Sequence, residues 1–343
     1  MKEYLDLISE RLSFMWYLTR HLRDGTFRYR SRDVQQTILA TKQYVRATLA
    51  PSLGLDRSSP ITIELPVKGL TNLLWLVRLA DKRCMVYSYL VHQWPRMEQQ
   101  ITALRLLNDN GVRAPRMLHS FADASKFGVY FVATEYVDGI SRAGKNQRLS
   151  VEEVECVAQQ LARLHSVRNS GWGRLCLPRN SDYFARQKRL VSRYLSVARK
   201  HRMLTSDQQK RMRSWFYNWR SSFAAVTRFS LIHGDLHPNN ILFEPGGGCC
   251  LLDTDRVAWN LGMWDVELVH ERICRGDTQL IQVFDARYLS LLESSDRELH
   301  QRLTPFFAAL LRLRLCVRDL GDTDENASMV QAWQELQKLT GLV

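Results

Sequence analysis

The most informative stretch of the sequence is LIHGDLHPNNILF, residues 231–243, which places two histidines, an aspartate and two asparagines between apolar ends. Asp235 lies five residues before Asn240, and Asp253 follows a second apolar run, CCLL. Transfer of a phosphoryl group needs an aligned hydroxyl and metal ions that neutralise the phosphate charge. An aspartate can orient and deprotonate the hydroxyl, while an amide carbonyl and a second carboxylate are hard oxygen ligands of the kind that Mg²⁺ prefers. These residues therefore favour phosphoryl transfer, and an ordinary polar turn is the alternative.

The histidines near this chemistry have different expected roles. His233 is expected to brace the loop by a hydrogen bond rather than to take part in the reaction. His237 fits an approach to a phosphate and the capping of a turn equally well. His165 lies near the end of an expected helix and is predicted to be a hydrogen-bonded, half-buried histidine.

The elements that must position these residues follow from the apolar pattern. Residues 231–232 and 241–243 predict short strands on both sides of the loop. Residues 1–50 carry apolar residues at helical spacing, whereas residues 61–67, 72–80 and 84–91 are rich in the branched and aromatic residues typical of strands. A helix around Leu104 and two more strands within 114–139 follow, and a helix begins at Ser150 with a capping-box pattern that includes Glu153. The pattern predicts a small strand-rich lobe followed by a large helical lobe.

The loop also resembles a known family. HGDLHPNN is similar to the catalytic loop of the aminoglycoside phosphotransferase and choline kinase-like superfamily, which shares the protein-kinase fold. The family pattern H-G-D-x-x-x-x-N, followed by a strand that ends in Asp, is matched by His233, Gly234, Asp235, Asn240 and Asp253. The resemblance implies that Asp235 is the catalytic base and that Asn240 and Asp253 bind Mg²⁺.

Other segments between residues 61 and 267 extend the resemblance. ATEYVDG is similar to the hinge between the lobes, which implies that backbone groups of Glu135, Tyr136 and Val137 bind adenine. GLTN is similar to the turn that covers the phosphates, which implies nucleotide-binding roles for Gly69 and Asn72.

Two later aspartates also fit the family. The resemblance implies that Asp255 helps to hold a second metal ion and that Asp265 has a structural role, since it matches the last residue of the family's G-D-P-x-x-D segment. That segment departs from the pattern at its start, because NLG, residues 260–262, stands in place of G-D-P.

The third expected strand departs further from the kinase pattern, which has a lysine there that binds the α- and β-phosphates. RCMVYSYL offers Tyr87 or Ser88 at that place. The nearest cations are out of register: Arg78, Lys82 and Arg83. The glutamate that pairs with this lysine in the family is matched by either Glu98 or Gln100 on the following helix.

The composition limits the possible partners and compartments. The net charge of +13 favours anionic partners. The seven cysteines contain no C-x-x-C pair and predict reduced thiols in the cytoplasm. Acidic residues interrupt the N-terminal apolar pattern, so no signal peptide is expected, and no apolar run is long enough for a transmembrane segment.

Residues 179–220 contain twelve Lys and Arg against Asp182 and Asp207, with seven interleaved aromatic residues. The pattern favours a pair of amphipathic helices whose charges face water. The alternative is a surface that binds an anionic ligand or nucleic acid. Nucleic acid is the less favoured partner.

Together these features predict a protein-kinase-like α+β fold with an N-terminal helical extension (1–59), a nucleotide-binding N-lobe (60–137) and a helical C-lobe with the catalytic loop and acceptor site (138–343). The expected function is ATP- and Mg²⁺-dependent phosphorylation of a hydroxyl on a sugar, an aminoglycoside-type antibiotic or an amino alcohol. An anionic acceptor also suits the basic charge. The rival hypotheses are a kinase-fold binding protein with lost or weak turnover, suggested by the missing lysine, and a protein that binds anionic surfaces.

Overall fold

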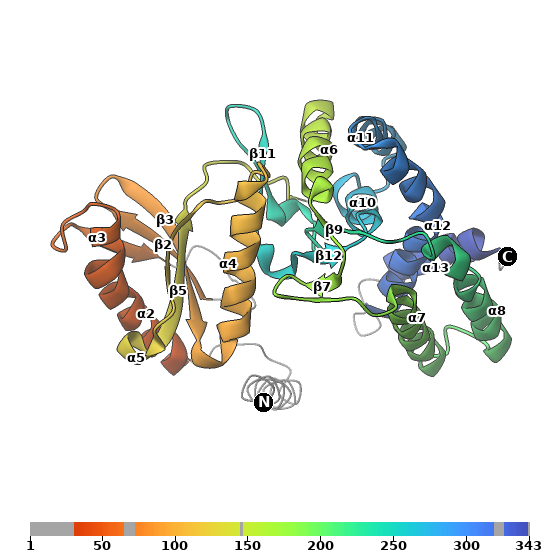
Figure 1. The fold of residues 1–343 in the computed structure, drawn as a ribbon, viewed down its shortest axis with the longest axis horizontal. Helices are drawn as coiled ribbons and strands as arrows, with labels where there is room; N and C mark the ends of the chain where they lie inside the picture. Colours follow the sequence, from red (N-terminus) through yellow and green to blue (C-terminus); the bar gives the residue numbers. More distant parts are fainter. Residues whose placement is uncertain (1–30, 65–72, 145–146, 319–325, 342–343) are drawn as a thin grey trace. The chain divides into compact units, whose positions relative to one another are not determined.

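The computed structural model describes residues 31–64, 73–144, 147–318 and 326–341. The chain divides into two compact units, residues 1–109 with 113–138 and residues 110–112 with 139–343. The first unit contains an antiparallel sheet and the second is mainly helical (Figure 1). The prediction of a mixed fold, strand-rich first and helical afterwards, is therefore confirmed.

The first unit contains a five-stranded sheet in the order β1-β2-β3-β5-β4. All its neighbouring strands are antiparallel. The strands are β1 (Ile61–Glu64), β2 (Leu73–Leu79), β3 (Lys82–Leu90), β4 (Met117–Phe121) and β5 (Val129–Glu135). The helical elements are α2 (Ser31–Tyr44), η1 (Val45–Leu49), α3 (Ala50–Ser52), η2 (Val91–Gln93), α4 (Trp94–Asp109) and α5 (Ala124–Phe127).

The two faces of this sheet are covered by different helices, as the alternation of side chains along a strand requires. Val86 of β3 belongs to a core that includes Tyr44 and residues of η1, and the Tyr44 ring stacks on Phe131 with 4.2 Å between ring centroids. Tyr89, which points to the other face of β3, donates a hydrogen bond to Gln100 of α4. Residues of the expected N-terminal helical extension thus share a hydrophobic core with the sheet.

The second unit contains two small sheets. One has five short strands in the order β6-β9-β12-β7-β8, and the other pairs β10 with β11. Their bounds are β6 (Arg168–Asn169), β7 (Trp172–Arg174), β8 (Leu177–Arg179), β9 (Phe229–Ile232), β10 (Ile241–Phe243), β11 (Cys249–Leu251) and β12 (Ala258–Asn260). β9 and β10 are the two strands expected beside the loop of residues 233–240, so that prediction is confirmed.

Helices form the rest of the second unit: α6 (Val151–Ser166), α7 (Tyr183–Lys200), α8 (Ser206–Tyr217), α9 (Arg220–Phe223), η3 (Pro238–Asn240), η4 (Thr254–Arg256), α10 (Met263–Leu268), η5 (Val269–Ile273), α11 (Thr278–Ser290), α12 (Ser294–Arg318) and α13 (Asn326–Thr340). α6 begins with the predicted capping box, in which the Ser150 hydroxyl accepts from the Glu153 amide. The described part of the chain holds no helix that is both long and apolar enough to cross a membrane.

Candidate active site

The loop with the predicted catalytic residues begins where β9 ends. All four residues of β9 are buried, and the strand lies between β6 and β12 in its sheet. After residues 233–237 the chain makes the single turn η3, which contains Asn240, and continues into β10. The loop is therefore held at both ends by hydrogen-bonded strands, so its polar side chains have little freedom to drift.

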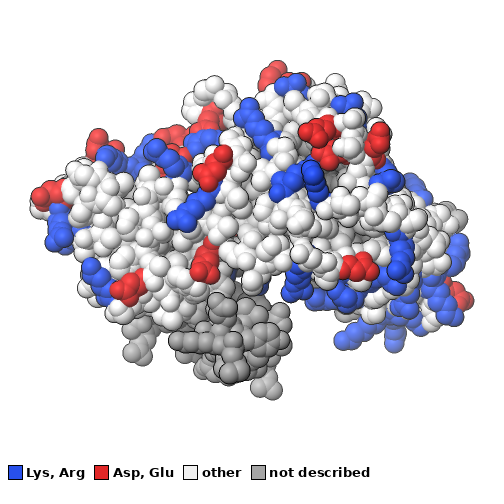
Figure 2. All heavy atoms as spheres, viewed as in Figure 1, with Lys and Arg blue, Asp and Glu red and all other residues white. Residues whose placement is uncertain are grey.

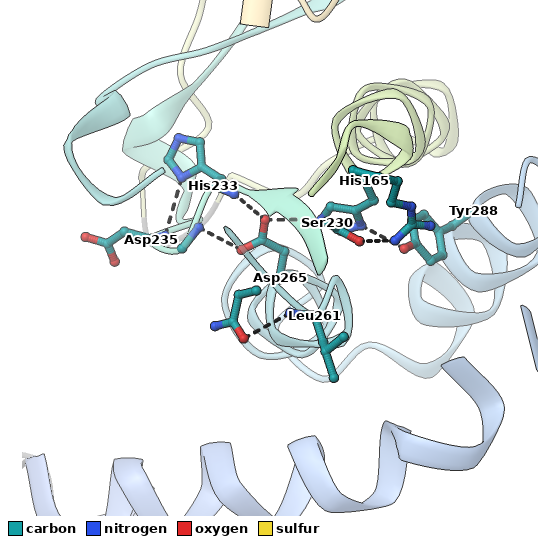
Figure 3. A network of polar contacts seen from close by, with 10 residues as sticks. His165, Ser230, His233, Asp235, Leu261, Asp265 and Tyr288 are labelled. Atoms are coloured by element: carbon teal, nitrogen blue, oxygen red, sulfur yellow. Dashed lines mark hydrogen bonds and ion pairs between the residues drawn. The ribbon is translucent and has the colours of Figure 1, made fainter. Parts of the chain in front are cut away.

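Asp265, in the first turn of α10, binds the backbone of the loop (Figure 3). Its Oδ2 accepts from the His233 amide at 2.6 Å, and its Oδ1 accepts from the Gly234 amide at 2.8 Å. The Asp265 side chain is fully buried, and a buried carboxylate requires such donors. These contacts agree with the structural role expected for Asp265.

His165 supports Asp265 from the other side. Its Nε2 lies 3.3 Å from Asp265 Oδ2, and its Nδ1 lies 2.7 Å from the Tyr288 hydroxyl (Figure 3). Both ring nitrogens have partners, as expected, but the side chain is fully buried rather than half-buried. Gly262 makes room for this ring, because a Cβ there would lie 2.6 Å from His165 Nδ1.

Gly234 is required for two reasons. Its φ of +80° lies in the left-handed region that other residues rarely adopt. A Cβ at this position would also lie 2.6 Å from the carbonyl oxygen of Arg256. The backbone before Asp235 can therefore take this path only with glycine.

His233 braces the loop, as predicted. Its Nε2 donates to the carbonyl oxygen of Leu252 at 2.7 Å, and its Nδ1 accepts from the Asp235 amide at 3.4 Å. The ring is buried. It ties the loop to the residue before Asp253.

The three predicted chemical residues lie on adjoining segments. The Asn240 side-chain amide donates to the carbonyl oxygen of Asp235 at 2.9 Å, and the Asn240 carbonyl accepts from the Leu252 amide at 2.8 Å. Asp253 follows directly, with a left-handed φ of +54°. The contacts join residues 235, 240 and 252, which are separated along the sequence, and Asp253 follows the last of these.

These residues suit a hard divalent cation. Because the Asn240 nitrogen is committed to the Asp235 carbonyl, its Oδ1 is the atom left to bind a metal. Burial and the neighbouring charge of Asp255 raise the pKa of Asp253, and a bound cation would favour its charged form. No group of three His, Cys, Asp or Glu able to hold a metal exists among the described residues. Mg²⁺ commonly needs only one or two carboxylates, with water and phosphate completing its shell.

Arg272 is a site residue that the sequence pattern did not reveal. Its Nη1 donates to Asp235 Oδ1 at 3.1 Å, and its side chain is only 18% exposed. It lies in η5, a π-helical continuation of α10, and such irregular turns are frequent at functional sites. Nothing in the local sequence indicates a contact across 37 positions.

His237 is half-buried, and burial lowers the pKa of its imidazole. It precedes η3 but makes no capping side-chain hydrogen bond there, judged over the residues that the structure describes. Of its two expected roles, this disfavours the capping of a turn.

Three of the residues expected to bind the nucleotide, Glu135, Tyr136 and Val137, lie in the first unit. Gly69 and Asn72 fall outside the described residues. The Glu135 amide donates to the Arg116 carbonyl, and its carboxylate is paired with Arg113. The Tyr136 ring lies under the guanidinium of Arg83, 4.4 Å from its centroid.

The positions of β3 where the kinase pattern has its lysine are occupied by other residues. Ser88 is buried and accepts a hydrogen bond from the Trp75 indole, so it is a core residue. The hydrogen bond between Tyr89 and Gln100 joins β3 to α4. The nearby cations have other partners within this unit: Arg78 pairs with Glu64, Arg83 pairs with Asp138, and Lys82 donates to the Leu53 carbonyl.

Solved structures of small-molecule kinases resemble this chain over most of its length. A putative fructosamine-3-kinase from Haemophilus somnus matches with a TM-score of 0.57 at 14% identity, over 87% of this chain and 96% of that one. The choline kinase LicA from Streptococcus pneumoniae matches with a TM-score of 0.55 at 16% identity, over 90% and 99%. An ethanolamine kinase from Plasmodium vivax matches with a TM-score of 0.58 at 12% identity, over 91% and 89%. At these identities the likeness establishes the protein-kinase-like fold.

The sequence comparisons identify the family. No curated protein matches the chain by sequence. The model of the phosphotransferase enzyme family (APH) matches residues 62–306, which is more than half of the chain and includes the whole loop and Asp265. The chain therefore belongs to the APH phosphotransferase enzyme family.

Proposed function

We propose that the protein transfers the γ-phosphoryl group of ATP to a hydroxyl group of a small-molecule acceptor, with Mg²⁺ as the metal ion. The observation that carries this proposal is that hydrogen bonds hold Asp235, Asn240 and the residue before Asp253 together, on a loop whose backbone is bound to a buried carboxylate. A polar turn that only satisfied its own backbone would not need this arrangement of oxygen atoms.

Asp235 would act as the base. Its Oδ1 is bound to Arg272, so Oδ2 is the atom that would accept a hydrogen bond from the acceptor hydroxyl. As the hydroxyl oxygen bonds to the γ-phosphorus, its proton passes to Asp235 and the bond to the bridging oxygen breaks, which releases ADP. Arg272 would keep the carboxylate at a fixed orientation, which matters because small misplacements of catalytic groups cost about 100-fold in rate.

Asn240 Oδ1 and the Asp253 carboxylate would hold Mg²⁺, with Asp255 close by for a second ion. The metal ion would neutralise the charge of the phosphates. The left-handed backbone at Asp253 directs its side chain differently from that of an extended residue, so the position is specialised rather than a simple strand end.

The adenine base would bind backbone groups at the end of β5. The Glu135 amide is already used within the sheet, so the adenine contacts would come from the Glu135 carbonyl and from Tyr136 and Val137. Gly69 and Asn72 would cover the phosphates, as the resemblance implies. We place the reaction in the cytoplasm, where ATP is supplied and where the seven free cysteines would stay reduced.

The acceptor would be a sugar, an aminoglycoside-type antibiotic or an amino alcohol. The support is the family and the names of its structural neighbours, which include a putative fructosamine-3-kinase, a choline kinase and an ethanolamine kinase. All of these names describe phosphorylation of compounds that carry a hydroxyl.

A second candidate function is a kinase-fold protein that binds its ligands but turns over weakly or not at all. The observation that favours it concerns the cations that could bind the phosphates of ATP. Tyr89 and Gln100 join β3 to α4, and the nearby Arg78 and Arg83 are paired with acidic residues. Such a protein would bind ATP without transferring phosphate.

A phosphorylation screen tests the proposal. The protein would be incubated with Mg²⁺-ATP and a panel of sugars, amino alcohols and aminoglycosides, and products would be detected by mass. Asp235→Asn should slow turnover of a detected acceptor at least about 100-fold, because removal of a general base costs roughly 10²–10⁴ in rate. Asp109→Asn, an exposed change at the end of α4, should leave turnover unchanged. Turnover that survives in Asp235→Asn would refute the assigned base, and ATP binding without any product would favour the binding protein.

A further inference from the structure

The positive charge of this chain is concentrated in one segment. Residues 179–228, called here the basic segment, contain thirteen Lys and Arg against two Asp, so they carry +11 of the formal net charge of +13. The other 293 residues hold 35 basic and 33 acidic residues and are nearly neutral. The charge is therefore a local property of one part of the second unit.

The basic segment is built around the hairpin of α7 and α8. Along α7 the buried residues include Phe184, Val191 and Leu195, and this face packs on α12. The exposed basic residues Arg189, Arg193 and Lys200 follow one another at spacings of four and seven. On a helix with 3.6 residues per turn they form one ridge on the side opposite the buried face, about 16 Å long.

The turn between α7 and α8 and the first part of α8 carry further positive charge. Exposed basic residues continue from the end of α7 into α8: Arg199, Lys200, Arg202, Lys210 and Arg211. Figure 2 shows Lys and Arg gathered over the part of the surface where Figure 1 places α7 and α8, with few acidic side chains among them.

This charge is not balanced by acidic partners. Within the described residues, the basic segment makes one ion pair, between Lys210 and Asp207 at 3.6 Å, and both side chains are more than three-quarters exposed. Asp182, the other acidic residue, caps the N-terminus of α7. Ten of the thirteen basic residues are exposed. An uncompensated array of this kind raises the free energy of the folded protein by self-repulsion unless an anionic partner relieves it.

The aromatic residues of the segment show which anionic partner fits. The Trp172 ring, next to the segment, is covered by the guanidinium groups of Arg179 and Arg186, and the Tyr217 ring is covered by the Lys188 ammonium. Protein surfaces that bind single-stranded nucleic acid use exposed aromatic rings on which the bases stack. Here the rings of Trp172 and Tyr217 are covered by cations, and the exposed basic residues form a ridge on the outer side of α7, which suits a layer of phosphate groups.

We propose that the basic segment docks the protein on an anionic lipid surface, with the ridge of α7 against the phosphate headgroups. Clusters of Lys and Arg on an amphipathic helix are attracted electrostatically to anionic lipid headgroups. The proposal does not depend on the phosphotransferase activity, because it uses no residue of the candidate active site.

Vesicle co-sedimentation with the full-length protein tests it. Vesicles of phosphatidylcholine mixed with phosphatidylglycerol are compared with vesicles of phosphatidylcholine alone, over a series of salt concentrations. The test variant is the triple change Arg189→Gln, Arg193→Gln and Lys200→Gln. The control is a triple change of equal charge in the first unit, at exposed residues: Lys42→Gln, Arg57→Gln and Arg105→Gln. Thermal unfolding confirms that both variants fold.

The unaltered protein should bind only the anionic vesicles, and binding should weaken as salt rises. The test variant should bind roughly 100-fold more weakly, as expected when three charges near an anionic surface are lost, whereas the control should lose much less. Equal losses in the two variants, or no preference for anionic vesicles, would overturn the proposal. Tighter binding to double-stranded RNA than to the vesicles, with the same dependence on the ridge, would assign the surface to nucleic acid instead.

Discussion

The carboxylate of Asp235 accepts a hydrogen bond from the guanidinium of Arg272, with 3.1 Å between Oδ1 and Nη1. Arg272 lies seven residues after Asp265, on the continuous helical segment formed by α10 and η5. Asp265 binds the backbone of the loop and Arg272 binds its key side chain. One helical segment therefore fixes both the path of the loop and the orientation of the candidate base.

We expect Arg272→Ala to lower kcat by about 10- to 100-fold, because the Asp235 carboxylate would lose its fixed orientation. The KM for ATP should change little, and Arg272→Lys should recover part of the rate, since it restores a cation without the planar fork. Steady-state kinetics with a detected acceptor would measure both. Arg148→Ala, an exposed residue in a 3.7 Å ion pair elsewhere in the same unit, serves as the control. A rise in the KM for ATP with unchanged kcat would contradict this role for Arg272.

Replacement of Gly234 by alanine should destabilise the protein and displace the loop. The positive φ costs about 1–2 kcal/mol for a residue with a Cβ, and the contact of 2.6 Å with the Arg256 carbonyl adds to that cost. Gly247→Ala is a matched control, because Gly247 has a φ of +77° but nothing within 4 Å of the place that a methyl group would occupy. Urea unfolding should show the larger loss for Gly234→Ala. Equal losses for the two variants would show that the close contact has no energetic consequence.

Asp253→Asn should weaken the gain in ATP affinity that Mg²⁺ provides, while the fold is kept. Asparagine tolerates the left-handed backbone at this position, so the change removes charge and little else. Loss of a residue that hydrogen-bonds to a metal ligand typically lowers metal affinity by roughly tenfold or more. Loss of the ligand itself should lower the affinity by at least as much. Calorimetry with Mg²⁺ and with EDTA, on both proteins, would measure it. If the unaltered protein binds ATP equally well in EDTA, Asp253 does not hold a metal ion.

Glu267 should make stability depend on pH. Its side chain is buried, and burial raises its pKa to about 7 from 4.5, so the folded protein holds a proton that the unfolded chain releases. The folded state binds more protons between these two values, and stability therefore falls as pH rises from about 4.5 to 7, by on the order of 3 kcal/mol. Glu267→Gln has no carboxyl group to titrate, so its free energy of unfolding should not fall in this way. The free energy of unfolding of Glu267→Gln, relative to that of the unaltered protein, should therefore rise between about pH 4.5 and pH 7.

Chemical denaturation at pH 5 and at pH 8 would test this difference. Glu298→Gln, an exposed change on α12, should follow the unaltered protein at both values. A Glu267→Gln variant whose stability relative to the unaltered protein is the same at both values would show that this carboxyl group titrates normally.

The sequence by itself determined the parts of the protein that depend on neighbouring residues. The five-residue spacing of Asp235 and Asn240, the apolar runs on both sides and the triplet His233–Gly234–Asp235 are local features, and they led to the strands, the loop and the family. The strand-rich and helical halves followed in the same way, because apolar periodicity reflects the face that each element buries.

Only the tertiary structure decided which distant residues meet the loop. Asp265 lies 31 positions from Gly234 and Arg272 lies 37 from Asp235, and these pairs form because α10 and η5 pack beside the end of β9. The hydrogen bond between Tyr89 and Gln100 depends likewise on which face of β3 meets α4. Such contacts follow from how elements pack in three dimensions, and a pattern read along the chain does not contain that geometry.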